Sequence, residues 1–369
     1  MHVVRGALKE YDWGVVDGLA RWCGRTGNPQ AELWFGTHPA GAAIVTEGAD
    51  AGRSLGDLAQ HQGMPLLKLL AASTPLSLQV HPDAERAHRG WADDQARAVE
   101  ERRFADPEEK CEMLVALTSF DVHAGWRAPQ AAAEVLRRAE APEAIVEAVA
   151  AGNHVEAVRQ ILELSADESG LVERRLVAAA TAAGWSTEAV SALARVAATH
   201  PADPGVLVTV LLDHARLEPG QGMAVPAGVI HSYVDGLGAE VMTSSDNVLR
   251  LGLTSKPIAV DDALGALRPD HAPVSLHGFA GEVMEPPNMP FDLVLADHPT
   301  ESHRGRHRVV LSLHGATRVA AGDEVRHVPE GLAAVVAPDE PDLAITPEGT
   351  AIVVTGAPTG YDGVRKEGR

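Results

Sequence analysis

The 369-residue sequence has few cysteines, and this scarcity excludes several classes of protein. Cys23 and Cys111 are its only cysteines, too few for a disulfide framework or a metal site built from thiolates. We therefore expect a reducing compartment, the cytoplasm. No segment approaches the roughly 18 consecutive apolar residues that a bilayer-spanning helix needs. Because the first residues have neither an apolar core nor a cleavage site, we also expect no secretory signal.

Positive charge is scarce as well. The 31 Lys and Arg residues face 51 Asp and Glu residues, which gives a formal net charge of −20. A surface this acidic repels nucleic acid and anionic lipid, so we expect neither as a partner. A small anionic substrate is still compatible with it, but would need a local cluster of positive charge. Few lysines are available for such a cluster: Lys9, Lys68, Lys110, Lys256 and Lys366.

The apolar pattern divides the chain into a strand-rich part, a helical part and a second strand-rich part. The length suggests two or three domains. Short apolar runs between Gly, Pro and Asp residues predict strands, among them 43–46, 76–81, 113–117, 308–313, 332–337 and 351–355. Residues 83–105 predict a helix and a loop. Alanine-rich sequence with helical spacing predicts a compact insert of four or five helices over 123–204, with Asn153 and Glu156 resembling a capping box.

A short internal repeat suggests how the strands are arranged. Residues 225–231, Val-Pro-Ala-Gly-Val-Ile-His, parallel residues 328–334, Val-Pro-Glu-Gly-Leu-Ala-Ala. The first copy has the Pro-x-Gly-x-x-His pattern of cupin barrels, in which the strand after the turn directs a histidine inward. The second copy has Ala334 in place of that histidine. Chance similarity of two strand–turn–strand pieces remains an alternative.

We therefore predict a mainly β fold with an α-helical insert and two cupin-type β-barrels, or jelly rolls, of which the first alone holds a metal. Residues 1–122 and 205–265 are expected to form the metal-binding catalytic domain. Residues 123–204 are expected to form the helical insert domain, and residues 266–369 a metal-free, cupin-like β domain.

Three segments contain residues capable of chemistry. In the strand 76–81, alternation places Ser77, Gln79 and His81 on the face opposite the apolar side chains. This polar face is either the solvated outside of a strand or the interior of a barrel with neighbouring metal ligands. In the next segment, Lys110 and Glu112 share a strand face, which fits either a surface ion pair or a site.

The third segment runs from 225 to 256. His231 follows the Pro and Gly of a turn, which favours an inward-facing imidazole. Asp246 and Arg250 flank apolar residues further along, although a plain turn with an exposed arginine would look similar. Together, Gln79, His81, Glu112 and His231 offer two nitrogen and two oxygen ligands. Such a set suits zinc first, with manganese or iron as alternatives.

These segments belong to a longer series of motifs that resembles the type I phosphomannose isomerases. The motifs appear in that family's order and extend over most of the first 260 residues. They are Tyr11-Asp-Trp-Gly14, Ala31-Glu-Leu-Trp-Phe-Gly-Thr-His-Pro39, Leu76-Ser-Leu-Gln-Val-His-Pro-Asp83, Lys110-Cys-Glu-Met113, His231-Ser-Tyr-Val234 and Ser245-Asp-Asn-Val-Leu-Arg-Leu-Gly-Leu-Thr-Ser-Lys256.

The resemblance implies one zinc ion per chain, with Gln79, His81, Glu112 and His231 as its ligands. It also implies a sugar-phosphate pocket, and the residues that would line it are Trp13, Glu32, Ser77, Lys110, Tyr233, Glu240, Asp246, Arg250 and Lys256. Glu109 stands where the family commonly has a histidine, so a proton-transfer role for that histidine does not carry over. Thr254-Ser255-Lys256 replaces the Thr-Pro-Lys that is frequent in the family.

The implied reaction interconverts mannose 6-phosphate and fructose 6-phosphate through a cis-enediol. Arg250 is the first candidate to stabilise the developing negative charge, and Lys110, Glu240 and Asp246 are candidates for proton transfer. Arg250, Lys256 and Ser77 are candidates to hold the phosphate. Two other readings remain open: an iron-dependent cupin that activates oxygen, and a non-catalytic sugar-binding barrel. We expect a monomer.

Overall fold

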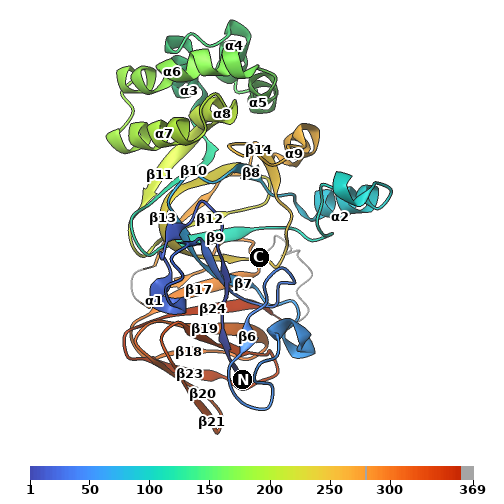
Figure 1. The fold of residues 1–369 in the computed structure, drawn as a ribbon, viewed down its shortest axis with the longest axis vertical. Coiled ribbons are helices and arrows are strands. Elements are labelled where there is room, and N and C mark those ends of the chain that lie inside the picture. Colours follow the sequence, from blue (N-terminus) through green and yellow to red (C-terminus); the bar gives the residue numbers. More distant parts are fainter. Residues whose placement is uncertain (279–280, 359–369) are drawn as a thin grey trace, which may run out of the picture.

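The computed structural model describes residues 1–278 and 281–358. It is elongated, with the largest group of helices at one end and the strands, accompanied by a few shorter helices, in the rest (Figure 1). The part of the chain that it describes is mainly β with a helical insert, as the sequence predicts. None of the described helices has the length and apolar character needed to cross a membrane.

A central sheet carries most of the polar residues singled out above. Its strands run in the order β15-β12-β9-β13-β7-β5-β2. Their bounds are β2 (Ala7–Lys9), β5 (Glu32–Phe35), β7 (Leu66–Ala72), β9 (Glu112–Ala116), β12 (Gln221–Val225), β13 (His231–Met242) and β15 (Val274–His277). Four more strands branch from this sheet: β8 (Leu78–Val80), β10 (Phe120–Trp126), β11 (Leu212–Leu217) and β14 (Leu249–Gly252).

The long strand β13 joins the two groups of strands. Its second half, from Gly236, pairs with β7 and β9, while its first half pairs with β10 and β8. His231 and Glu240 therefore lie on different parts of one strand. Alternation on β9 separates two apolar cores: Leu114 packs toward β10, whereas Met113 and Val115 pack toward the C-terminal strands.

Two further sheets lie at the other end of the molecule. One has the order β16-β17-β24-β19-β22-β1-β6, and the other β18-β23-β20-β21. The first comprises β1 (His2–Arg5), β6 (Ile44–Val45), β16 (Val283–Met284), β17 (Phe291–Ala296), β19 (Arg306–His314), β22 (Leu332–Val336) and β24 (Thr350–Pro358). The second comprises β18 (Thr300–Ser302), β20 (Thr317–Ala321), β21 (Glu324–Val328) and β23 (Leu343–Pro347), and a small separate pair is β3 (Val15–Val16) with β4 (Pro29–Gln30).

The sheet pairing departs from the predicted domain boundaries at two places. Strand β1 pairs with β22, so the first strand of the chain belongs to the C-terminal sheet. Strand β15 lies beyond residue 265 but pairs with β12 in the central sheet. Both departures involve partners far away in the sequence, which apolar patterning does not reveal.

Ala334 lies in an apolar core with Ala296 and Val310.

The helical insert lies against the outer side of β8 and β14 (Figure 1). Within 123–204 it comprises five helices, in agreement with the four or five predicted: α3 (Pro129–Arg138), α4 (Glu143–Ala150), α5 (His154–Leu162), α6 (Ala166–Ala182) and α7 (Thr187–Thr199). A further helix, α8 (Gly205–Val210), packs with them just beyond the predicted insert; its sequence Gly-Val-Leu-Val-Thr-Val favours strands in isolation but is entirely buried here. The capping-box prediction at Asn153 is wrong, because that side chain makes no capping hydrogen bond.

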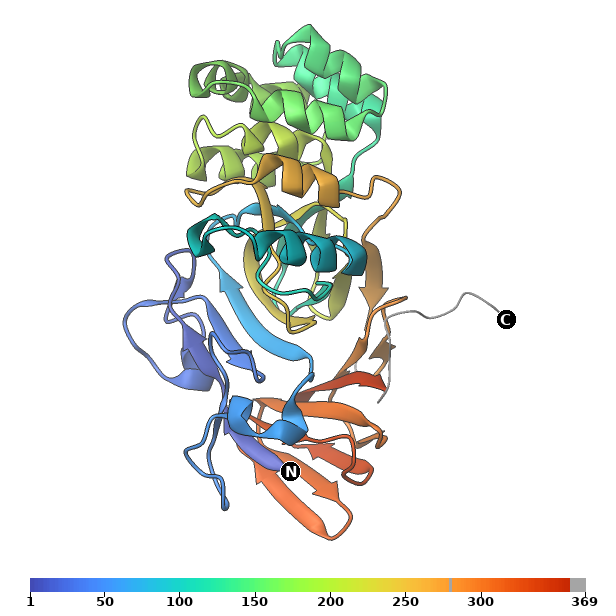
Figure 2. The ribbon, with the colours of Figure 1, turned by 90° about the vertical axis from the view of Figure 1, so that its right-hand side faces the viewer.

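The shorter helical segments surround the sheets. They are α1 (Ala20–Cys23), α2 (Ala84–Asp94), α9 (Val260–Ala266) and the 3-10 turns η1 (Leu55–Asp57), η2 (Ala59–His61) and η3 (Val99–Glu101). Helices α2 and α9 run across the same side of the molecule (Figure 2). An ion pair of 2.6 Å between Arg86 and Asp262 joins them. Asp83 caps α2 two residues after His81, so the end of β8 is fixed in place.

Candidate metal centre and its pocket

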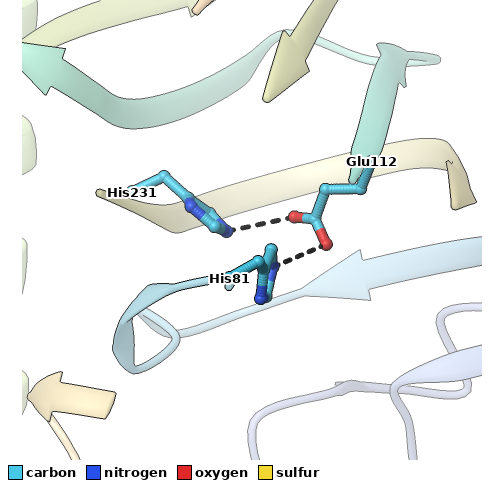
Figure 3. Close-up of side chains that lie close together, drawn as sticks. All are labelled: His81, Glu112 and His231. Atoms are coloured by element: carbon cyan, nitrogen blue, oxygen red, sulfur yellow. Dashed lines mark hydrogen bonds and ion pairs between the residues drawn. The ribbon is translucent and has the colours of Figure 1, made fainter. Parts of the chain in front are cut away.

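Three of the four predicted metal ligands meet at one point. His81 directly follows β8, Glu112 begins β9 and His231 begins β13. Figure 3 shows both imidazoles directed at the Glu112 carboxylate. His81 Nε2 lies 3.0 Å from Oε2, and His231 Nε2 lies 3.1 Å from Oε1. All three side chains are fully buried.

The hydrogen-bond partners of the two histidines assign their tautomers. His81 Nδ1 lies 2.9 Å from the carbonyl oxygen of Asn247, and His231 Nδ1 lies 3.1 Å from that of Val229. A carbonyl oxygen can only accept, so each Nδ1 carries a proton and donates it. Each neutral ring therefore presents the lone pair of Nε2 to the carboxylate.

This arrangement brings buried lone pairs face to face, and a cation would relieve it. Two Nε2 lone pairs point at two carboxylate oxygens, and His231 Nε2 has no hydrogen-bond donor among the described residues. Protonation of the His81 ring is opposed, since burial, followed by the charge of Lys110, lowers its pKa to about 3. Two imidazole nitrogens and a carboxylate are a ligand set that zinc accepts. The residues therefore fit a divalent metal.

The carboxylate of Glu112 is held in its ionised form. Burial opposes its charge, but Lys110 holds the pKa of Glu112 well below its usual value. Lys110 Nζ lies 3.4 Å from Oε2. The hydroxyl of Tyr233 donates to Oε1 at 2.8 Å. Tyr233, expected to line the pocket, is itself buried and contacts the candidate ligand directly.

Gln79 lies in the same row as His231 and Arg250. The three residues are cross-strand partners on β8, β13 and β14, with Gln79 in the middle. Directly opposed residues in an antiparallel pair point to the same face. Gln79 is half-buried and lies on the same face as His231. Its role as the fourth ligand stays a prediction.

A buried group of charges lies next to these residues. Lys68 Nζ is 2.7 Å from Glu240 Oε2 and 3.6 Å from Glu32 Oε1, with all three side chains less than a tenth exposed. Burial opposes charge on the lysine, but the two carboxylates raise the pKa of Lys68 above its usual value. Burial raises the pKa of Glu240, although Lys68 acts in the opposite direction. Lys68 follows the face of Leu70 on β7, which turns it inward.

A rim of half-exposed residues lies above these charges. The side chain of Asp246 is about half exposed, and its Oδ2 lies 3.2 Å from His38 Nε2. Trp13 is half-buried and stacks on Tyr11 with ring centroids 5.8 Å apart. Ser77 is half-buried in the segment just before β8.

Arg250 and Lys256 supply the positive charge that an anionic substrate requires. Burial lowers the pKa of Arg250, and burial together with Arg250 lowers the pKa of Lys256. Within residues 1–278 and 281–358, neither side chain has a carboxylate within ion-pair distance, unlike Lys68 and Lys110. Lys256 stays near a turn, its amide donating to Thr254 Oγ1 at 3.1 Å.

Glu109 is separate from this site. It lines a different pocket of about 280 Å³ together with Cys111 and His271, and none of the candidate metal ligands lines that pocket. Burial and the charge of Asp83 raise the pKa of Glu109. The replacement of histidine by glutamate at this position therefore changes a neighbouring pocket, not the environment of Glu112.

Several residues of the site were not predicted from the sequence. Lys68, His38 and Asn247 each contact a candidate residue, yet none was selected. Lys68 carried a signal, because it is a lone charge inside the apolar run Leu66–Ala72. His38 and Asn247 carried none beyond membership of the quoted motifs.

Comparisons with known proteins agree with this geometry. Residues 1–129 match the family model described as "Phosphomannose isomerase type I, catalytic domain", a segment that contains His81 and Glu112 but ends before His231. Over 317 residues, the chain is 28% identical to mannose-6-phosphate isomerase of Salmonella typhimurium, with 78% of each chain covered. Over 302 residues it is 29% identical to the Macaca fascicularis enzyme of the same name, covering 69% of this chain and 70% of that one.

Solved structures have the same fold. The Salmonella typhimurium mannose 6-phosphate isomerase bound to its substrate and zinc superposes with a TM-score of 0.83 at 24% identity, covering 97% of this chain and 99% of that one. The apo form gives a TM-score of 0.82 with the same coverage. The match of the catalytic domain, the curated relatives and the ordered motifs all relate this chain to the type I phosphomannose isomerases.

Proposed function

We propose that this chain interconverts mannose 6-phosphate and fructose 6-phosphate by proton transfer through a cis-enediol. The observation that carries the proposal is the buried meeting of His81, Glu112 and His231, in one row of strands with Arg250, which has no ion pair among the described residues. The names of its relatives support the same substrate, as does the neighbour solved with substrate and zinc.

One divalent metal per chain, zinc in the first place, would be held by His81, Glu112 and His231 with Gln79 as the fourth ligand. Such an ion supplies Lewis acidity, which lowers the cost of negative charge on substrate oxygens. The protein's own contribution is orientation. The Nδ1–H donors of both imidazoles and the hydroxyl of Tyr233 fix the ligand atoms before substrate arrives.

Lys110 and Glu240 are the groups that move protons between the two reacting carbons. Both are buried, Lys110 beside Glu112 and Glu240 against Lys68. Burial raises the pKa of Glu240, which makes its protonated form easier to populate. This suits a group that must both take and return a proton. Lys68 keeps that carboxylate in place and is shared with Glu32.

Arg250 and Lys256 hold negative charge on the substrate. Arg250 sits one strand from Gln79, close enough to the metal ligands to face the enediol oxygens. Lys256 lies further out, where a phosphate would be held as a point-charge contact with Ser77 nearby. Asp246, Glu32 and Trp13 bind sugar hydroxyls, and Asp246 assists ring opening from the rim.

The architecture that we assign to this activity has two cupin-type barrels joined by a helical insert. The metal-binding barrel would use the central sheet with β8, β10, β11 and β14, and the second barrel the C-terminal sheets together with β1. The second barrel would hold no metal, because Ala334 and its neighbours are apolar. We further propose a cytoplasmic monomer that binds neither nucleic acid nor membrane, on the grounds of few cysteines and a net charge of −20.

The test combines metal analysis of the purified protein with a coupled assay on mannose 6-phosphate before and after chelation. We expect about one zinc per chain, turnover that chelation abolishes, and recovery when zinc is restored. His231→Ala should lose metal and turnover together. Full activity of the metal-free protein would reject the proposal. Sugar-phosphate binding without solvent-proton exchange at C1 or C2 would indicate a binding protein, and oxygen uptake would indicate an oxygenase.

A further inference from the structure

We propose that His38 is a positioning residue that fixes the carboxylate of Asp246 beside the candidate metal centre. The inference rests on the proposed isomerase function, because Asp246 matters only if the pocket binds a sugar. His38 lies far from Asp246 in the sequence, and it touches neither the candidate metal ligands nor the buried pair of Lys68 and Glu240.

The contacts of the imidazole determine which nitrogen carries the proton. The backbone N–H of Ala40 donates to His38 Nδ1 at 3.2 Å, so Nδ1 is an acceptor without a proton. The proton of the neutral ring is therefore on Nε2, which lies 3.2 Å from Asp246 Oδ2. His38 donates one oriented hydrogen bond to the carboxylate.

The local sequence holds the ring in this place. His38 starts a turn in which Gly41 N donates to the carbonyl of His38 at 2.9 Å, and Pro39 occupies the second position that turns favour. The turn directs the Ala40 N–H back toward the imidazole. The edge of the ring packs against Trp34 with centroids 5.2 Å apart, and only 3% of His38 is exposed. The side chain has little freedom to leave.

Asp246 is held from one side only. Its backbone N–H donates to Asp106 Oδ2 at 2.9 Å, which fixes the main chain, while about half of the side chain is exposed. The charged and titratable groups around the carboxylate are His38, Lys68, Lys110, Tyr11 and Asp106. The hydrogen bond from His38 is the largest cause that lowers the pKa of Asp246. Oδ1 is left to face a substrate hydroxyl in a constant orientation.

Kinetics of matched variants test this role. In His38→Ala we expect kcat to fall by about 10- to 100-fold with a smaller change in KM, since orientation contributes to the chemical step. The acidic limb of the pH profile of kcat/KM should move to higher pH, because Asp246 loses the bond that favours its ionised form. His38→Gln, whose amide places a donor near the position of Nε2, should recover much of kcat. Zinc content should stay at the wild-type level in both variants.

A double-mutant cycle separates positioning from general destabilisation. In an Asp246→Asn background, His38→Ala should cause little further loss, because its target is already removed. Equal losses in the presence and absence of the Asp246 carboxylate would overturn the proposal. So would equal damage from His38→Ala and His38→Gln, or an acidic limb that does not move.

A spectroscopic readout keeps the inference independent of the proposed reaction. In protein labelled with ¹⁵N-histidine, His38 should show a protonated Nε2 and an unprotonated Nδ1, identified by the signal lost in His38→Gln. Asp246→Asn should shift the Nε2–H resonance. Absence of isomerase activity in the wild type would refute the proposed function, whereas the opposite tautomer of His38 would refute this contact.

Discussion

At the scale of the residue, the least compensated charge of the pocket is Arg250. Its cross-strand neighbour on β8 is Gln79, which in turn pairs with His231 on β13, and burial lowers the pKa of the guanidinium without an ion pair among the described residues. A buried cation without a partner is costly. A substrate anion that binds there would remove part of that cost, which ties the charge to function and not to folding.

We therefore predict that Arg250→Ala lowers kcat by about 10²- to 10³-fold, the range for loss of one preorganised donor at developing negative charge. Steady-state kinetics with mannose 6-phosphate measure this, and metal analysis should find unchanged zinc. Arg250→Lys should recover part of the rate, since it keeps the charge but loses the planar fork. If KM alone rises, Arg250 contributes to ground-state binding and not to the chemical step.

A second prediction concerns Asn247, whose main-chain carbonyl accepts the proton of His81 Nδ1. Its amide fastens residues 105–108: Oδ1 accepts from Ala105 N at 2.9 Å, and Nδ2 donates to the carbonyls of Asp106 and Glu108 at 2.8 and 2.7 Å. Asn247→Ala frees this carbonyl, and zinc affinity should fall by about 10- to 100-fold. Competition with a chromophoric chelator measures the affinity.

The matched control is Asn153→Ala, which changes the same residue type in the helical insert, away from the metal centre. It should leave zinc affinity unchanged. Wild-type affinity in Asn247→Ala would mean that His81 is oriented by Glu112 alone.

Alternation on a strand groups residues of this site on one face but does not say whether that face is inside or outside. For His81 and Glu112 it left both possibilities open, and the resemblance to the family favoured the inside; both side chains are buried. Lys68 and Glu240 show the limit. They are 172 residues apart in the chain, so the ion pair in which they neutralise each other forms only when β7 and β13 are paired. A lone charge in an apolar strand indicates a buried partner but not which one.

At the scale of the element, the helical insert shows where local signals succeed and where they fail. Its alanine-rich character predicted helices, but the capping box was placed at Asn153, whereas the structure has it at Ser165 and Glu168. Ser165 Oγ accepts from Glu168 N at 3.3 Å, and Glu168 Oε2 accepts from Ser165 N at 2.9 Å. Both sequences contain a suitable residue pair, so only the backbone conformation at the helix start distinguishes them.

We predict that Ser165→Ala lowers the free energy of unfolding by about 1 kcal/mol, because the first turn of α6 loses a reciprocal cap. Asn153→Ala should change it by less than about 0.5 kcal/mol, since no capping bond is lost. Denaturant unfolding followed by circular dichroism measures both. Equal losses in the two variants would contradict the assignment of the cap.

At the scale of the whole molecule, a shared apolar core connects the two β parts. Leu69 and Met113 of the central sheet pack in one cluster with Leu311, Val335 and Ile352 of the C-terminal sheet. Strand β1 adds a second connection. It pairs with β22 in the C-terminal sheet, and the chain continues from it into β2 of the central sheet. Apolar patterning predicted the strands but not this connection between the sheets, because it gives no information about which sheet a strand belongs to.

The shared core leads to a prediction for thermal unfolding after metal removal. Zinc would bind only the folded protein, with a stabilisation of about 2.7 kcal/mol at a free metal concentration 100 times Kd. Because Glu112 lies on β9, whose Met113 and Val115 pack in the core shared with the C-terminal sheet, we expect chelation to lower the midpoint of one common thermal transition by several degrees. Calorimetry and near-ultraviolet circular dichroism should report the same midpoint, with and without zinc. In His231→Ala, chelator should cause no shift. Two separate transitions, of which only one responds to zinc, would mean that the shared core does not couple the two β parts.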